Sequence, residues 1–147
     1  MRNEITEWIE EAFREHSKPL RRVPEPEASG IVRQLMAHFV DGNPRVWWLA
    51  LRHGHTTYSS VDNSFEAIAP ESDHTIWFIP ETDEFPLPVF DLSPVDVDFI
   101  RANCPLFEYY VADKHGNWIV IENDHDEFIV SCQPPRKEKV DLESPSS

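Results

Sequence analysis

The sequence is poor in the residues that mark several large classes of protein. Its four glycines are isolated from one another, so no glycine-rich phosphate-binding loop is present. Its two cysteines, Cys104 and Cys132, form no CxxC pair and no disulfide framework, which fits a reducing setting. No apolar run approaches the roughly 18 residues of a membrane helix, and the N-terminal MRNEITEWIEE lacks the apolar segment of a secretory signal. We therefore expect a cytoplasmic protein without a membrane span.

Basic residues are also scarce: 13 lysines and arginines stand against 27 aspartates and glutamates, for a net charge of −14. Residues 62–131 hold sixteen acidic and two basic residues and carry the whole imbalance, because residues 1–61 and 132–147 are each neutral. So acidic a chain is a poor candidate for direct binding to nucleic acid or anionic lipid. Two interpretations stay open. The acids only keep the protein soluble, or they present a negative face to a cationic partner and speed its association.

Apolar material, by contrast, is ample. Hydrophobic residues make up 40% of the chain and aromatics 12%, which is enough for the core of one domain of ordinary size. Residues 1–133 are expected to form this single globular domain. Residues 134–147 have no apolar pattern and are expected to be a disordered tail. Prolines make residues 17–27 an irregular connector within the domain.

Three segments carry helical signals. Residues 3–16 and 29–40 place apolar side chains at helical spacing. A third helix is expected over residues 93–103, where Ser93 is the N-cap and proline takes the first helical position. Asp96 lies at the position that an acidic residue takes in a capping box. The sequence therefore predicts two N-terminal helices and one central helix.

Short apolar and aromatic runs without helical spacing predict strands. The clearest form a C-terminal meander, with a hairpin loop at 113–117 and a polar turn at 123–126. Residues 52–64 are expected to form either a loop or an edge strand. Residues 80–90 contain three prolines and are expected to be largely irregular. Without βαβ alternation, the order predicts an α+β fold whose three helices pack on a mostly antiparallel sheet ending in a three-stranded meander. The expected strands are residues 46–51, 65–69, 75–79, 107–112, 118–121 and 128–130.

The densest polar cluster is residues 122–127, with four acids and a histidine between two apolar strands. One interpretation is a solvated hairpin turn, since Asn and Asp favour tight turns. The other is a tip that recognises a cationic partner. A calcium loop does not fit, because Phe128 and Ile129 stand where that loop needs a ligand and a glycine. The candidate partner-binding residues are Asp113, Glu122, Asp124, His125, Asp126 and Glu127.

Aromatic side chains could anchor such a partner. Because side chains alternate along a strand, one of Trp47 and Trp48 is expected to face the packed layer and the other a second surface or groove. An exposed aromatic beside acids would make a good anchor for a protein partner.

No catalytic signature is present. The pair His53 and His55 falls short of the three or four ligands that zinc needs, and Cys104 has no local base to activate it. We therefore expect no catalytic residue, no metal and no cofactor. The alternative is a metal-dependent hydrolase that uses His125 with acids of the 122–126 cluster. A third possibility is a domain without a catalytic role.

Several of these runs together resemble a known group of proteins. The stretch from Phe107 to Val111, followed by Lys114 and by Trp118 to Asp126, resembles the C-terminal signature of a family of small, acidic, uncharacterised bacterial proteins. Trp47-Trp48 and Ile76-Trp77-Phe78-Ile79 fit the same family, so the resemblance covers about residues 45–130. It implies no activity and transfers no catalytic residue.

A looser similarity, of type and not of motif, is to the immunity proteins of bacterial toxin systems. Those proteins are short, acidic and cytoplasmic, and they neutralise nucleases whose active sites are basic because they bind phosphate. The leading hypothesis is thus a small acidic binding protein that occludes the basic site of a toxin or nuclease. Its partner would be a basic protein, without nucleic acid or membrane, and the oligomeric state stays open.

Overall fold

The computed structural model describes residues 4–72 and 74–134, which form helices on a single antiparallel sheet. The helices are α1 (Glu4–Glu15), α2 (Glu27–Phe39), α3 (Phe65–Ile68) and α4 (Pro94–Asn103), with a 3-10 helix, η1, at Trp47–Ala50. The strands are β1 (Arg21–Arg22), β2 (His55–Ser59), β3 (Ile76–Pro80), β4 (Phe90–Leu92), β5 (Tyr109–Asp113), β6 (Trp118–Glu122) and β7 (Glu127–Cys132).

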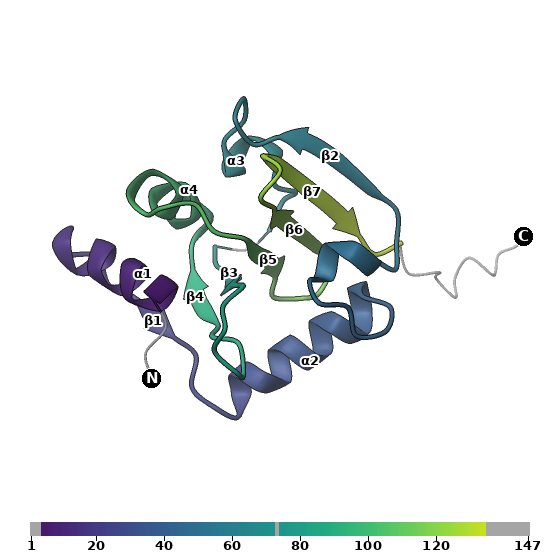
Figure 1. Cartoon of the computed structure of the whole chain (residues 1–147), viewed down its shortest axis with the longest axis horizontal. Helices are drawn as coiled ribbons and strands as arrows, with labels where there is room; N and C mark the ends of the chain where they lie inside the picture. The colour runs from purple at the N-terminus through teal and green to yellow at the C-terminus, as the bar shows by residue number, and fades with distance from the viewer. Residues whose placement is uncertain (1–3, 73, 135–147) are drawn as a thin grey trace, which may run out of the picture.

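The sheet has the strand order β1-β4-β3-β5-β6-β7-β2, and every neighbouring pair is antiparallel. This arrangement confirms the predicted α+β fold, and β5, β6 and β7 make the predicted meander. Helix α2 covers one face, whereas α1, α3 and α4 gather on the other (Figure 1). Because both faces are covered, every residue of β5 and β6 is buried.

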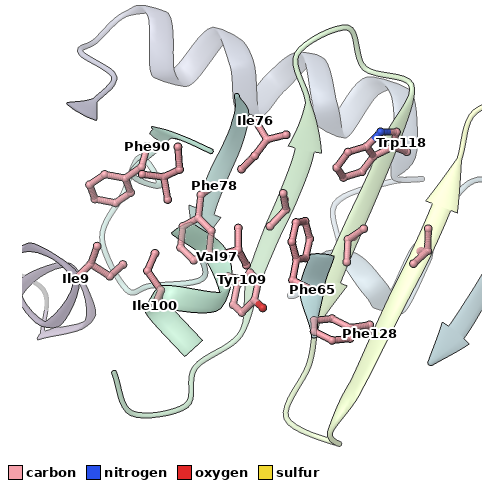
Figure 2. Packing of buried hydrophobic residues seen from close by; sticks show 14 of the residues in the cluster. Ile9, Phe65, Ile76, Phe78, Phe90, Val97, Ile100, Tyr109, Trp118 and Phe128 are labelled. Carbon is pink, nitrogen blue, oxygen red and sulfur yellow. The ribbon is translucent and has the colours of Figure 1, made fainter. Parts of the chain in front are cut away.

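Two hydrophobic cores sandwich the sheet, and alternate residues of β5 serve one or the other. Tyr109 joins Ile9, Phe65 and Ile100 in the core beneath α1, α3 and α4 (Figure 2). Tyr110 instead faces the core beneath α2. No described helix is long and apolar enough to cross a membrane. The predicted tail, 134–147, lies outside the described residues except for Pro134.

The prediction of a strand at 46–51 is wrong, since this stretch forms η1. Three successive side chains differ in burial, without the alternation that an extended strand shows. Trp47 is buried against Tyr110, whereas Trp48 is half-buried and Leu49 is exposed. A short apolar run has too few residues for its period to separate a strand from a helical turn.

The prediction of a strand at 65–69 is also wrong, because Phe65–Ile68 is α3. Ser64 Oγ caps this helix by accepting a hydrogen bond from Ala67 N at 3.1 Å. The carboxylate of Asp98 on α4 accepts from Phe65 N and Glu66 N at 2.9 and 3.1 Å. The helix is therefore held by a side chain 33 residues away in sequence, which local pattern does not show.

Gly116, in the turn between β5 and β6, is a position where side chains are disfavoured. Its φ is +73°, and an added Cβ would lie 2.9 Å from Nδ1 of His38. We expect Gly116→Ala to lower the free energy of unfolding by about 1–2 kcal/mol, the cost of a left-handed residue with a Cβ. The matched control is Gly54→Ala, whose added Cβ meets no atom within 4 Å. Urea unfolding measures both variants, and equal stabilities would contradict the prediction.

Candidate functional site

The turn between β6 and β7 presents a group of polar residues that we call the acidic tip: Asp124, His125, Asp126 and Glu127. The buried Asn123 fixes its conformation. Asn123 Oδ1 accepts hydrogen bonds from the backbone N–H of His125 at 2.9 Å and of Glu127 at 3.2 Å, and its Nδ2 donates to Glu127 Oε1 at 2.9 Å. Asp126 adopts the left-handed region, φ 60°, which aspartate tolerates in turns. The acidic tip is thus an ordered structure with exposed charges.

Glu108, just before β5, fastens the acidic tip to η1. Its Oε2 accepts from Asp124 N at 3.0 Å and from the indole N–H of Trp48 at 3.4 Å. The rings of Trp48 and His125 meet edge to face, with centroids 5.7 Å apart. Trp48 is therefore a half-buried aromatic beside the acids, as an anchor for a partner would be. Neither Glu108 nor Asn123 was among the predicted site residues, although an Asn at the start of a polar turn is a recognisable turn signal.

An exposed leucine adjoins these acids. Leu106 is 79% exposed, and with Asp124 and Asp126 it lines a hollow of about 110 Å³. This volume is well below the roughly 300–1,000 Å³ of typical sites for small molecules. The surface around the acidic tip therefore offers charge with an apolar neighbour, and it suits a protein surface better than a small molecule.

Two of the six predicted site residues do not lie on this surface. Asp113 is 3% exposed and stands at the opposite end of β6, where its carboxylate accepts from the backbone N–H of Asn117 at 2.6 Å and of Trp118 at 3.3 Å. Glu122 is 6% exposed and lies beneath the acidic tip. Both carboxylates hold turns and helices in place, and only the other four predicted residues come together.

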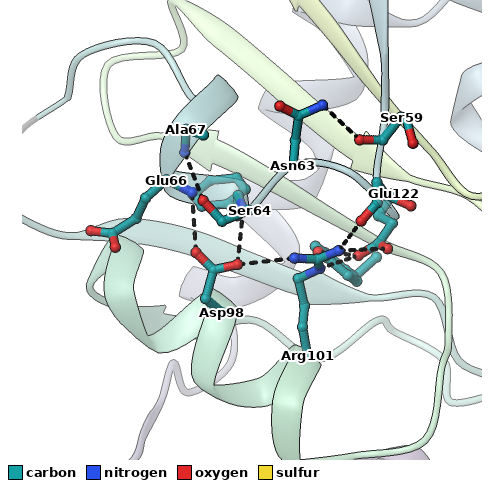
Figure 3. A network of polar contacts seen from close by, with 11 residues as sticks. Ser59, Asn63, Ser64, Glu66, Ala67, Asp98, Arg101 and Glu122 are labelled. Atoms are coloured by element: carbon teal, nitrogen blue, oxygen red, sulfur yellow. Dashed lines mark hydrogen bonds and ion pairs between the residues drawn. The ribbon is translucent and has the colours of Figure 1, made fainter.

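Glu122 belongs to a buried network centred on Arg101 of α4 (Figure 3). Arg101 Nε lies 3.0 Å from Glu122 Oε1, Nη1 lies 3.1 Å from Asp98 Oδ1, and Nη2 donates to Ser60 O at 2.6 Å. The guanidinium also lies over the ring of Phe128, 4.7 Å from its centroid. One side chain thus joins α4, β6 and the segment before α3.

The hydroxyl of Tyr109 completes the network by donating to Glu122 Oε1 at 2.5 Å. Burial, and then the charge of Glu122, raise the pKa of Tyr109 well above its usual range. Tyr109 therefore stays protonated, and remains a donor, at neutral pH. The network supports the acidic tip from below, and it is structural because Glu122 and Asp98 both have partners within the protein.

The described residues give little support to the alternative function, a metal-dependent hydrolase. Within residues 4–72 and 74–134, no three side chains of His, Cys, Asp or Glu are grouped so that they could hold a metal ion. His125 Nε2 lies 3.5 Å from Oδ1 of Asp124, and His53 Nε2 lies 3.1 Å from the carbonyl oxygen of His38. The predicted histidine pair is therefore engaged in part with the backbone.

Cys104, the C-cap of α4, has the chemistry of a structural cysteine. Burial raises the pKa of its thiol to about 11, and Sγ lies 3.7 Å from the carbonyl oxygen of Trp8. Because the thiolate is the reactive form, we expect a disulfide reagent at pH 8 to modify the exposed Cys132 rapidly and Cys104 only on unfolding. Timed thiol titration of Cys132→Ser and Cys104→Ser separates the two rates. Fast reaction of Cys104 in the native protein would contradict this assignment.

Comparison of the chain with protein-family models, with curated proteins and with solved structures finds no match. The resemblances drawn from the sequence therefore place the chain in no family.

Proposed function

We propose that this protein is a binding protein whose acidic tip docks onto a basic site of a protein partner, in the manner of an immunity-type inhibitor of a toxin or nuclease. The single observation that carries the proposal is the ordered, exposed turn. Three exposed side chains, Asp124, His125 and Asp126, project from a loop whose backbone is held by Asn123 and Glu108. A binding surface that is already ordered loses little conformational entropy on association.

The distribution of charge supports the same proposal. The acids at the acidic tip belong to the segment that carries the whole net charge, whereas Glu122 and Asp98 nearby share an ion-pair partner, Arg101. Uncompensated negative charge on a rigid turn attracts a cationic partner and accelerates its association. Trp48 and Leu106 beside the acids supply apolar contact area, so that bound partners are retained as well as attracted.

The test is affinity capture from the source cells at low salt with three forms of the protein. The first is wild type, and the second carries Asp124→Asn, Asp126→Asn and Glu127→Gln. The third is a charge-matched control, in which exposed acids elsewhere are neutralised by Asp62→Asn, Glu66→Gln and Glu71→Gln. Glu122 is left intact, because its removal would disturb the Arg101 network.

We expect a basic protein to be retained by wild type and by the control and to be lost by the acidic-tip variant. Its association rate should fall at least about tenfold between low and high salt, as electrostatic steering requires. Equal retention by all three forms would overturn the proposal, and so would an association rate that ignores salt.

A further inference from the structure

A second hollow lies far from the acidic tip in sequence, between α2, residues 43–47 and residues 81–87. We call it the α2 groove. Its volume is about 500 Å³, within the range of sites that bind small molecules, roughly 300–1,000 Å³. Its apolar surface comes from side chains of all three segments, among them Met36, Trp47 and Leu87. Phe85, 95% exposed, stands at its rim.

The floor of the α2 groove is built before any ligand arrives. Trp47 stacks on Tyr110 with ring centroids 4.2 Å apart and an angle of 10° between the planes. The Tyr110 hydroxyl accepts from Trp47 N at 3.3 Å and donates to Glu81. Glu84 is held by Arg22 at 2.5 Å and by Thr6 at 3.3 Å. Of the three acids that line the groove, Glu81 and Glu84 are therefore already engaged within the protein, and the third, Asp83, is exposed.

The arginines of the α2 groove form no ion pair within the part of the chain that the structure describes, although the charge of Arg45 acts on Glu81. Nine lysines and arginines lie in the described part of the chain, and six of them form ion pairs with described carboxylates. Arg14, Arg33 and Arg45 form no ion pair or side-chain hydrogen bond there, and the last two both line the groove. Acids outnumber bases about twofold in this chain, so unpaired arginines are unexpected, and two at one hollow indicate a site for an anion.

Glu81 stands at the floor and does not cancel this preference. Burial raises the pKa of its carboxyl, and the charge of Arg45 opposes that rise. Its hydrogen bond from Tyr110 directs the carboxyl toward the protein interior. The charged groups that remain available to a ligand are thus Asp83, Arg33 of α2 and Arg45, so that cationic groups outnumber the available carboxylate two to one.

From this geometry we infer that the α2 groove binds a small organic anion. A flat apolar body would lie against Trp47, Met36 and Leu87, and its carboxylate-, sulfonate- or phosphate-type head would meet the guanidinium groups of Arg33 and Arg45. Phe85 at the rim would lose exposed surface when the body of the ligand is in place. This site is separate from the acidic tip, and either can fail without the other.

The probe is anilinonaphthalene sulfonate, an aromatic anion that fluoresces in apolar sites, with anilinonaphthalene as its neutral counterpart. We expect saturable binding of one sulfonate probe per chain. The variant Arg33→Gln/Arg45→Gln should weaken it at least about tenfold, since hydrogen bonds to charged groups are the strong ones. Arg14→Gln, which removes the third unpaired arginine, should leave it unchanged. The neutral compound should bind wild type and all variants alike.

Absence of saturable binding would overturn the inference. Equal affinity of the sulfonate for the double variant and for Arg14→Gln would also overturn it, because the arginines of the groove would then not recognise the anion. Parallel loss of the neutral compound would show that the substitutions act on the shape of the groove and not on its charge, which overturns the anion assignment as well.

Discussion

Replacing Arg101 with leucine is expected to lower the free energy of unfolding by about 3–5 kcal/mol, the range for breaking a buried ion pair from one side. Glu122, with a side chain 7% exposed, would keep its charge but lose its cation. Asp98 would lose the same partner while still accepting from the N-terminus of α3. Urea unfolding followed by circular dichroism measures the loss.

Two further variants test the cause of this loss. Arg52→Leu removes an ion pair whose side chains are 44% and 67% exposed, and surface pairs of this kind contribute at most about 1 kcal/mol. Arg101→Leu combined with Glu122→Leu removes both buried charges, so we expect it to regain part of the stability that Arg101→Leu loses. Similar losses in Arg52→Leu and Arg101→Leu would contradict the importance of the buried network.

Phe78→Ala is expected to cost a similar amount, about 3–5 kcal/mol, through lost burial and the cavity that remains. Phe78 of β3 is fully buried and stacks on Tyr109 at 4.8 Å between centroids (Figure 2). It also meets Phe107 edge to face at 6.3 Å. Because these neighbours belong to the central strands and the segment before them, they cannot readily collapse into the space. Chemical denaturation at fixed temperature gives the difference in stability.

Phe85→Ala is the matched control for this substitution. The same atoms are removed from a ring that is 95% exposed, so the stability should stay within about 0.5 kcal/mol of wild type. A large loss at Phe85, or a small one at Phe78, would show that the hydrophobic core lies elsewhere than between β3, β5 and the helices above them.

The parts of the fold that sequence pattern predicted are those with local causes. The capping signal at Ser93 and Asp96 is realised, with Ser93 N donating to the Asp96 carboxylate at 3.3 Å, and α4 begins there. The meander follows from apolar runs separated by polar turns. Local pattern predicts strands at 46–51 and 65–69, and both predictions are wrong. The structure of these stretches depends on partners distant in sequence, Tyr110 for the first and Asp98 for the second.

The same distinction between local and distant causes applies to the candidate site. Sequence pattern alone predicts the turn that forms the acidic tip, because a polar run between two apolar strands is typical of a turn at the ends of those strands. It could not show that Glu122 is buried, since that depends on Arg101, 21 residues away in sequence and on another element. It also could not show that Arg33 and Arg45 share a groove, because α2 and the segment after it are placed by the sheet beneath them.

The strand order also determines when the molecule can finish folding as it is synthesised. The outer strands, β1 and β2, come from the first 59 residues, yet they pair with β4 and β7. Contacts this distant in sequence form late, because the intervening loops must close first. Until residues 127–131 of β7 have left the ribosome, β2 lacks the strand with which it pairs. A chain interrupted before that point would present unpaired strands and invite association with other nascent chains.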